Sequence, residues 1–168
     1  MKRFLCIILS GILAASLLGC SPNSLTPSDT HKFYYRHAEF QYGIENSVIE
    51  SEQRDVSGHA GDLFYLITLY LSGPLDETLI SPFPSSTRLL SVEKHEKALL
   101  ITLTDSGVSV LDSEYSLACV CLALTCMEFP DFTQVTIQNQ SRSITLSREQ
   151  LTLFDTTSHQ QTVSEETQ

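Results

Sequence analysis

Three cysteines in one apolar stretch are the residues whose spacing most invites chemistry. Cys119, Cys121 and Cys126 fall in a segment that we expect to be helical. On a helix, Cys119 and Cys121 lie about 200° apart around the axis, so they cannot hold one ion together. Cys126 lies ~10 Å along the axis from Cys119 and ~7.5 Å from Cys121, beyond the ~7 Å that a disulfide spans. We therefore predict no metal site and interpret the thiols as small buried side chains.

The remaining acid, base and nucleophile candidates form no catalytic constellation in the sequence. The chain contains no His-Glu-x-x-His, Gly-x-Ser-x-Gly, P-loop or dinucleotide-binding pattern. The histidines are scattered, at His31, His37, His59, His95 and His159. The paired carboxylates, Asp76 with Glu77 and Asp112 with Glu114, lie near loop or helix starts, where acids act as caps and solubilising groups. We predict a non-enzymatic protein with no catalytic residue and no cofactor.

Cys20 is the one residue to which the sequence assigns a modification. Lys2 and Arg3 form a basic start, and an apolar run from Phe4 to Leu18 follows. The ending Leu-Leu-Gly-Cys20 resembles the bacterial lipobox, in which signal peptidase cuts before the cysteine and the thiol receives diacylglycerol. We predict a signal peptide at residues 1–19 and lipid attachment, including palmitate, at Cys20. The alternative is an uncleaved membrane anchor, although the run is shorter than the ~20 residues that a spanning helix needs.

The charge balance narrows the range of partners. The formal net charge is −10, and loss of Lys2 and Arg3 leaves eight basic against twenty acidic residues, a charge of −12. Such a chain offers no basic patch for phosphates, so we expect no nucleic-acid binding. An anionic bilayer repels an acidic body. We therefore expect the lipid on Cys20 to anchor the protein to the extracytoplasmic face of the cell membrane, with the folded part standing off an anionic surface.

Composition divides the rest of the chain into a tether, one domain and a tail. Residues 20–31 comprise the lipidated cysteine and a polar, proline-bearing flexible tether. Residues 32–155 have the apolar content of a single domain. Residues 156–168 are mostly Thr, Ser, Gln and Glu, and we expect them to be disordered.

Two helices are expected in this domain. The first begins near Asp62 or Ser57 as its cap, carries an apolar stripe, and ends at Gly73 and Pro74. The stripe consists of Leu63, Leu66, Ile67, Tyr70 and Leu71. The second spans residues 116–129 and is apolar almost all round, which predicts burial on several sides. A capping box formed by Ser147 and Gln150 predicts a final helical turn.

Alternating apolar residues predict the strands. We expect strands at residues 32–42, 49–56, 87–92, 99–104, 135–137 and 144–146, with a hairpin turn at His95-Glu96. The segment 49–56 is polar enough to be an edge strand, and its Glu52-x-Arg54 pair would contribute ~0–1 kcal/mol as a surface ion pair. The predicted class is α+β, with two helices packed on one face of a mainly antiparallel sheet.

Three sequence stretches resemble a known family. Tyr-Leu-Ser-Gly-Pro74, Thr-Arg-Leu-Leu-Ser-Val92 and Leu-Ala-Leu-Thr-Cys-Met-Glu-Phe-Pro130 are similar to segments of the GerM (GerMN) domain of spore-forming and related bacteria. The likeness covers roughly residues 33–146. It implies a core of α-β-β-α-β order, similar to the ring-building folds of sporulation channel proteins, with extra N-terminal strands. It also implies a role in sporulation, germination or the cell envelope through protein contacts.

The functional hypothesis from the sequence is a lipid-anchored, non-catalytic protein-interaction module with unknown protein partners, which could also form a homo-oligomer. The chain has room for one GerM-like domain, whereas the sporulation protein carries two in tandem, so a general envelope role stays open. The alternative is a small-ligand or cell-wall-binding lipoprotein that uses the loop from Leu79 to Thr87 as a lip. A hydrolase without a recognisable motif is a third hypothesis.

Overall fold

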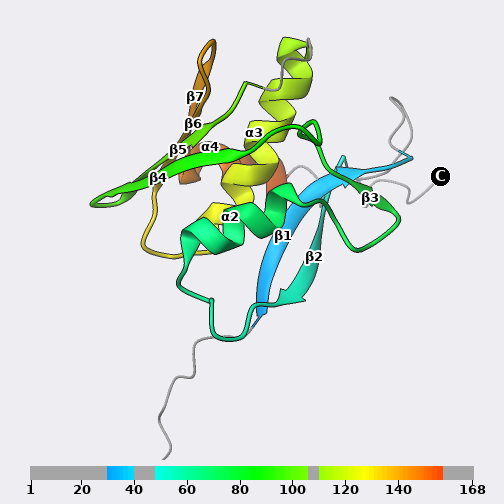
Figure 1. Ribbon diagram of the computed structural model, residues 1–168, viewed down its shortest axis with the longest axis horizontal. Coiled ribbons are helices and arrows are strands. Elements are labelled where there is room, and N and C mark those ends of the chain that lie inside the picture. The colour runs from blue at the N-terminus through cyan, green and yellow to red at the C-terminus, as the bar shows by residue number, and fades with distance from the viewer. Residues whose placement is uncertain (1–29, 40–47, 106–109, 157–168) are drawn as a thin grey trace, which may run out of the picture.

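The computed structural model describes residues 30–39, 48–105 and 110–156 and has an α+β fold, as predicted (Figure 1). In chain order its elements are β1 (Thr30–His37), β2 (Ile49–Asp55), α2 (Leu63–Leu71), β3 (Leu79–Ile80), β4 (Leu89–His95), β5 (Ala98–Leu103), α3 (Asp112–Met127), β6 (Gln134–Gln138), β7 (Ser143–Ser147) and α4 (Arg148–Thr156). The expected signal peptide, the lipid site at Cys20, nearly all of the tether, and residues 157–168 of the expected tail lie outside the described residues. Within the described part, no helix is both long and apolar enough to cross a membrane.

The N-terminal strands form a three-stranded antiparallel sheet of their own, in the order β2-β1-β3. Phe33 and Tyr35 on β1 are fully buried. Arg36, also on β1, is half-buried. β2 is an edge strand, as its polar sequence predicts. The two-residue strand β3 was not predicted, because two apolar residues ahead of a proline-rich loop show no alternation.

The second sheet has the order β4-β5-β6-β7. The pairs β4/β5 and β6/β7 are antiparallel hairpins, but β5 and β6 run parallel. The sequence predicted one mainly antiparallel sheet; the chain instead divides its strands between two sheets. The parallel pair arises because α3 carries the chain back along the sheet before β6 begins.

Apolar alternation places β5 and β6 at the centre of the core. Leu99, Ile101 and Leu103 on β5 are at most 1% exposed, and Val135 and Ile137 on β6 are fully buried. This arrangement confirms the predicted alternation. The hairpin before β5 turns at Glu96, whose φ of 51° is the left-handed conformation that a tight turn requires.

The helix α2 begins and ends where the sequence predicts. Asp62 is its N-cap, and the Asp62 carboxylate accepts a hydrogen bond of 3.0 Å from the backbone N–H of Tyr65. The chain leaves the helix through Gly73, whose φ of 96° disfavours other residues. Its buried residues are Leu63, Leu66, Ile67 and Tyr70.

The longest described helix, α3, lies between the two sheets. It packs against β1 on one side and against β6 and β7 on the other (Figure 1). It begins at Asp112, four residues before the predicted start. Nine of its sixteen residues are buried, which confirms the prediction that it is enclosed on several sides.

The helix α4 starts at the predicted capping box. The side-chain oxygen of Gln150 accepts a hydrogen bond of 2.9 Å from the backbone N–H of Ser147. In return, the Ser147 hydroxyl accepts one of 3.4 Å from the backbone N–H of Gln150. The helix then continues to Thr156, beyond the single turn that was expected.

Candidate functional site

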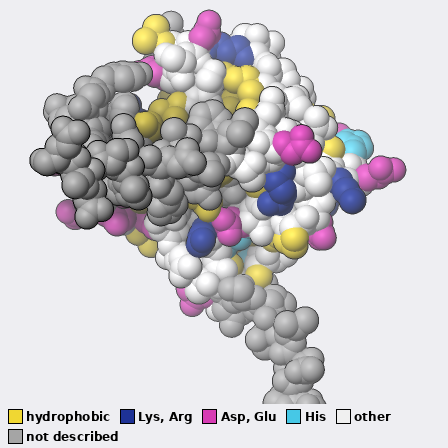
Figure 2. All heavy atoms as spheres, turned by 180° about the vertical axis from the view of Figure 1, so that it is seen from behind, with side chains coloured by type: hydrophobic (Ala, Val, Ile, Leu, Met, Phe, Trp, Pro, Cys, Tyr) yellow, Lys and Arg dark blue, Asp and Glu magenta, His cyan; other side chains and the backbone are white. Residues whose placement is uncertain are grey.

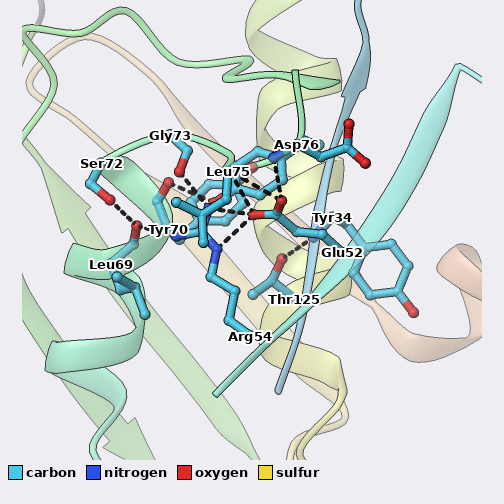
Figure 3. A network of polar contacts seen from close by, with 11 residues as sticks. Tyr34, Glu52, Arg54, Leu69, Tyr70, Ser72, Gly73, Leu75, Asp76 and Thr125 are labelled. Atoms are coloured by element: carbon cyan, nitrogen blue, oxygen red, sulfur yellow. Dashed lines mark hydrogen bonds and ion pairs between the residues drawn. The ribbon is translucent and has the colours of Figure 1, made fainter. Parts of the chain in front are cut away.

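A buried polar network lies where β2 meets the end of α2 (Figure 3). Arg54 and Glu52 form an ion pair whose side chains are 5% and 10% exposed. The expectation of a surface pair is therefore wrong. The pair is buried because alternate residues of β2 face inward, where Val56 is also buried.

The guanidinium of Arg54 binds the carbonyl end of α2. It donates to the backbone oxygens of Gly73 and, at 3.5 Å, of Leu69. Its Nη2 also donates to the hydroxyl of Tyr35 at 3.2 Å. The last carbonyls of a helix lack intrahelical partners and carry partial negative charge. A buried cation at this end donates hydrogen bonds to carbonyl oxygens and offsets their charge.

The carboxylate of Glu52 fixes the loop that follows α2. It accepts hydrogen bonds from the backbone N–H groups of Leu75 at 3.1 Å and Asp76 at 2.9 Å (Figure 3). This loop leads directly into β3 and the lip loop (Leu79–Thr87). The ion pair therefore positions the start of the segment that leads into the lip loop.

Two tyrosines connect this network to the core. The rings of Tyr35 and Tyr70 stack with centroids 4.8 Å apart and an interplanar angle of 4°. The hydroxyl of Tyr35 donates to the backbone oxygen of Tyr70 at 3.1 Å. Burial raises the pKa of Tyr35 well above its ordinary value, although the charge of Arg54 opposes the rise. Burial also raises the pKa of Tyr70, with Cys121 and Tyr35 adding to the effect. Both hydroxyls are therefore neutral at physiological pH, and that of Tyr70 is buried without a hydrogen-bond partner among the described residues.

The three cysteines of α3 are buried free thiols, in agreement with the interpretation from helix geometry. Burial raises the pKa of Cys119, Cys121 and Cys126 to about 12 each. A thiol must ionise to act as a nucleophile or metal ligand. These side chains therefore function as packing groups in the folded protein.

Thr125 joins α3 to β1. Its hydroxyl accepts a hydrogen bond of 3.0 Å from the backbone N–H of Tyr34 and donates one of 3.0 Å to the backbone oxygen of Cys121. The backbone oxygen of Thr125 also lies 3.0 Å from Nε2 of His31. Burial lowers the pKa of His31, and its bond to Thr125 opposes that shift. Thr125 thus satisfies a backbone group of β1 at a point that the short strand β3 does not reach.

The other described histidines occupy separate places. Nδ1 of His37 accepts the backbone N–H of Glu39 at 3.2 Å, and His59 stacks on Tyr65 with ring centroids 4.0 Å apart. His95 lies on the surface near the end of β4, while His159 falls outside the described residues. Over residues 30–39, 48–105 and 110–156, no group of three or more His, Cys, Asp or Glu side chains is placed to hold a metal.

The carboxylates near element starts take local roles. Asp76 accepts hydrogen bonds from the backbone N–H and the hydroxyl of Thr78, and these bonds lower the pKa of Asp76. Asp112 and Glu114 lie in the first turn of α3, where acids offset the positive end of the helix. Asp112 also lies 3.4 Å from Arg142. The first-turn positions of Asp112 and Glu114 agree with the prediction of acids near a helix start, but neither caps α3, whose N-cap is Leu111 without a side-chain hydrogen bond.

A groove beside the lip loop is one place in the described part that could accept a ligand. Its lining includes Arg36, Pro82, Phe83, Pro84, Glu114 and Leu117. Phe83 holds the lip loop on the core by edge contacts with Tyr70 and Tyr115, at centroid distances of 6.4 and 6.5 Å. The Nε atom of Arg36 is buried and has no hydrogen-bond partner among the described residues. With Arg36 and Glu114 both in its lining, the groove offers a cation and a carboxylate beside apolar side chains.

Acidic and basic side chains are interspersed over the face shown in Figure 2, which has no large patch of either sign.

Comparison with known proteins leaves the family open. No protein-family model matches the chain, and no curated protein matches it. Among solved structures, the chain is similar to the crystal structure of a candidate lipoprotein from Clostridium perfringens, with 19% identity, a TM-score of 0.46, and coverage of 71% of this chain and 87% of that one. Similarity at this level assigns neither a family nor an activity. The resemblance to GerM domains and the lipid site at Cys20 stay predictions.

Sequence reasoning missed the arginines that act within the fold. Arg148 donates to the backbone oxygens of Met127, Phe129 and Phe132 at 2.8 to 2.9 Å, much as Arg54 does for α2. For Arg54 a signal was present, because it lies two residues before the apolar Val56 and so shares its face. The roles of Arg148 and Arg36 depend on residues that surround them in the fold but are distant in sequence, so no local pattern indicates them.

Proposed function

We propose that this protein is a lipid-anchored, extracytoplasmic, non-catalytic protein-interaction module of the cell envelope, with sporulation or germination as its setting. The observation that carries the proposal is the basic start at Lys2-Arg3 and the apolar run that ends in Leu-Leu-Gly-Cys20. A diacylglycerol-modified Cys20 would hold the domain at the outer face of the membrane by its acyl chains. The GerM-like stretches support the setting.

The edge strand β7 supports a role in protein contacts. It lies last in its sheet, and no described strand pairs with its outer edge. Its residues, Ser143 to Ser147, include no charge and no proline, which are the usual devices that block unwanted pairing at an edge. A partner strand could add there through backbone hydrogen bonds. Such addition would also allow two copies to pair.

Labelling with radioactive palmitate tests the anchor. The wild-type chain should incorporate label in the source bacterium, and Cys20→Ala should abolish it. The matched control is Cys119→Ala, which alters a buried thiol of α3 and should leave labelling unchanged. Label that persists in Cys20→Ala would exclude this cysteine as the attachment site.

Affinity capture from membranes of the source organism tests the interaction role. Thr145→Lys places a charge in the middle of β7, which should reduce capture of a strand-adding partner at least tenfold. Size-exclusion chromatography with light scattering, at several concentrations, shows whether the partner is a second copy. Equal capture by wild type and Thr145→Lys would show that this edge is not the contact surface.

The groove beside the lip loop favours a second candidate function, a small-ligand or cell-wall-binding lipoprotein. Its support is the lining of the groove, which combines the charged side chains of Arg36 and Glu114 with apolar ones. Sedimentation with purified cell wall should then deplete the wild-type protein and leave Arg36→Gln in solution. Equal depletion of both proteins would remove the groove from consideration.

A further inference from the structure

Two exposed aromatic side chains occupy the first turn of α2. Phe64 is 51% exposed and Tyr65 is 37% exposed. His59 stacks on the ring of Tyr65 at an interplanar angle of 19°, which holds that ring in place. The nine residues of α2, Leu63–Leu71, include no charged side chain. The outer side of this turn therefore presents apolar ring surface to its surroundings.

This aromatic pair (Phe64 and Tyr65) lies at the end of the domain where the tether enters. Thr30, the first described residue, pairs with Asp55 at the end of β2. From there a short turn leads to α2, and Ala60 of that turn lines a surface hollow together with Thr30 and His31. Figure 1 shows this turn next to the start of β1. The aromatic pair follows directly from the turn.

The opposite end of the molecule carries another exposed apolar residue. Leu111 is 68% exposed and precedes α3, whose sixteen residues span about 24 Å. The far end of α3 meets the start of β1, since Nε2 of His31 lies 3.0 Å from the backbone oxygen of Thr125. Leu111 is therefore remote from the tether (Figure 1).

The tether limits how the domain can lie on a membrane. Nine residues, 21–29, separate Cys20 from Thr30, and the ten steps between these two residues reach at most about 35 Å when fully extended. A lipid on Cys20 therefore keeps the end of the domain where the tether enters within about 35 Å of the bilayer, and this end carries the aromatic pair. The end at Leu111 reaches the bilayer only if the domain turns over on an extended tether.

We propose that Phe64 and Tyr65 rest in the membrane interface, so that the anchored domain has a fixed orientation with Leu111 pointing away from the lipid. This inference rests on the lipid anchor of the proposed function. Aromatic rings partition favourably into the interface. Two rings bind weakly by themselves, but the anchor supplies the high local concentration that makes a weak contact persist.

The charges near the aromatic pair specify the kind of lipid. Asp55 and Asp62 are exposed beside it, and the whole chain is acidic. Anionic headgroups repel these carboxylates, so the contact requires a neutral or zwitterionic surface. Anionic lipid should therefore weaken the contact.

The absence of tryptophan from the sequence allows a direct measurement. Phe64→Trp and the control Leu111→Trp each place a single fluorophore at an exposed apolar position. The chain from Cys20 onward, which retains every described residue, is coupled through Cys20 to a maleimide lipid in phosphatidylcholine vesicles that contain brominated phosphatidylcholine. The buried thiols of α3 should not compete for the maleimide.

The proposal predicts that brominated lipid quenches the Phe64→Trp signal at least twofold more than the Leu111→Trp signal. Replacing half of the lipid by phosphatidylglycerol should reduce this difference. Equal quenching, or none, at both positions would overturn the proposal. Because maleimide supplies the attachment, this result is independent of acylation in the cell, and only the palmitate experiment with Cys20→Ala tests the anchor.

Discussion

The helices α2 and α3 are both rich in apolar residues, but different interactions hold them in place. α2 is stabilised at its ends, where Asp62 caps the first turn and Arg54 binds the final carbonyls. α3 has Leu111 at its N-cap, which provides no side-chain hydrogen bond, and is buried along most of its length. Thr125 is its principal polar link to β1.

This difference shows that apolar content alone does not determine how a helix is secured. α3 lies between two sheets, so side-chain packing surrounds it. α2 covers one side of the molecule and leaves the aromatic pair exposed, so its ends need specific polar partners. Substitutions that remove a polar group should therefore destabilise the protein most at α2. Substitutions that remove side-chain volume should destabilise it most at α3.

The largest effect is expected from Arg54→Ala. It leaves the carboxylate of Glu52 buried without its cation, which costs about 3–5 kcal/mol of unfolding free energy. Urea unfolding followed by circular dichroism measures the loss. Lys97→Ala, at an exposed position, is the control and should change stability by about 0.5 kcal/mol or less. A loss below about 1 kcal/mol for Arg54→Ala would show that water replaces the ion pair.

The next effect concerns volume in α3. Leu122 is fully buried, so Leu122→Ala should cost about 2–5 kcal/mol through lost burial and a residual cavity. The same truncation at Leu124, which is only half-buried, should cost clearly less. Both are measured by the same urea titration. Equal losses at the two positions would contradict the enclosure of α3.

A smaller effect tests the polar link of α3. Thr125→Val keeps the shape but leaves the N–H of Tyr34 without its acceptor, which should cost about 1–3 kcal/mol. Ser116→Ala is the matched control, because its hydroxyl also bonds a backbone oxygen four residues earlier but makes no contact with β1. Amide hydrogen exchange should rise at Tyr34 in the valine variant alone. Unchanged exchange there would show that β1 does not depend on Thr125.

The smallest effect concerns the helix starts. Asp62→Ala removes the cap of α2 and should cost about 1 kcal/mol, whereas Asp62→Asn should be nearly neutral. Leu111→Ser supplies the cap that α3 lacks and should stabilise the protein by about 0.5–1 kcal/mol. Thermal unfolding resolves these shifts. A stabilising Asp62→Ala would reverse the comparison between the two helices.

Local patterns predicted most of the elements. The stripe on α2, its Gly73 stop, the alternation in β5 and the capping box at Ser147 each depend on residues close in sequence, and each is confirmed. The start of α3 was predicted four residues late, since Asp112 and Glu114 have no apolar periodicity.

Relations between distant segments were not predictable. The separation into two sheets depends on which strands pair, and the polar sequence of β2 could not show that Glu52 and Arg54 lie beneath the end of α2. The groove at Arg36 likewise brings together β1, the lip loop and α3. The lipid attachment at Cys20 stays a prediction from sequence alone, because the described residues begin ten positions after it.

The parallel pairing of β5 and β6 has a consequence for how the chain folds. The β4/β5 and β6/β7 hairpins join neighbouring segments and can form early, whereas the β5/β6 ladder joins residues separated by α3, about 36 positions apart in sequence (98 with 134). Contacts of high sequence separation slow folding because the intervening loop must close first. The docking of α3 should therefore be the rate-limiting event, and a nascent chain that ends before β6 would expose β5 as an aggregation-prone edge.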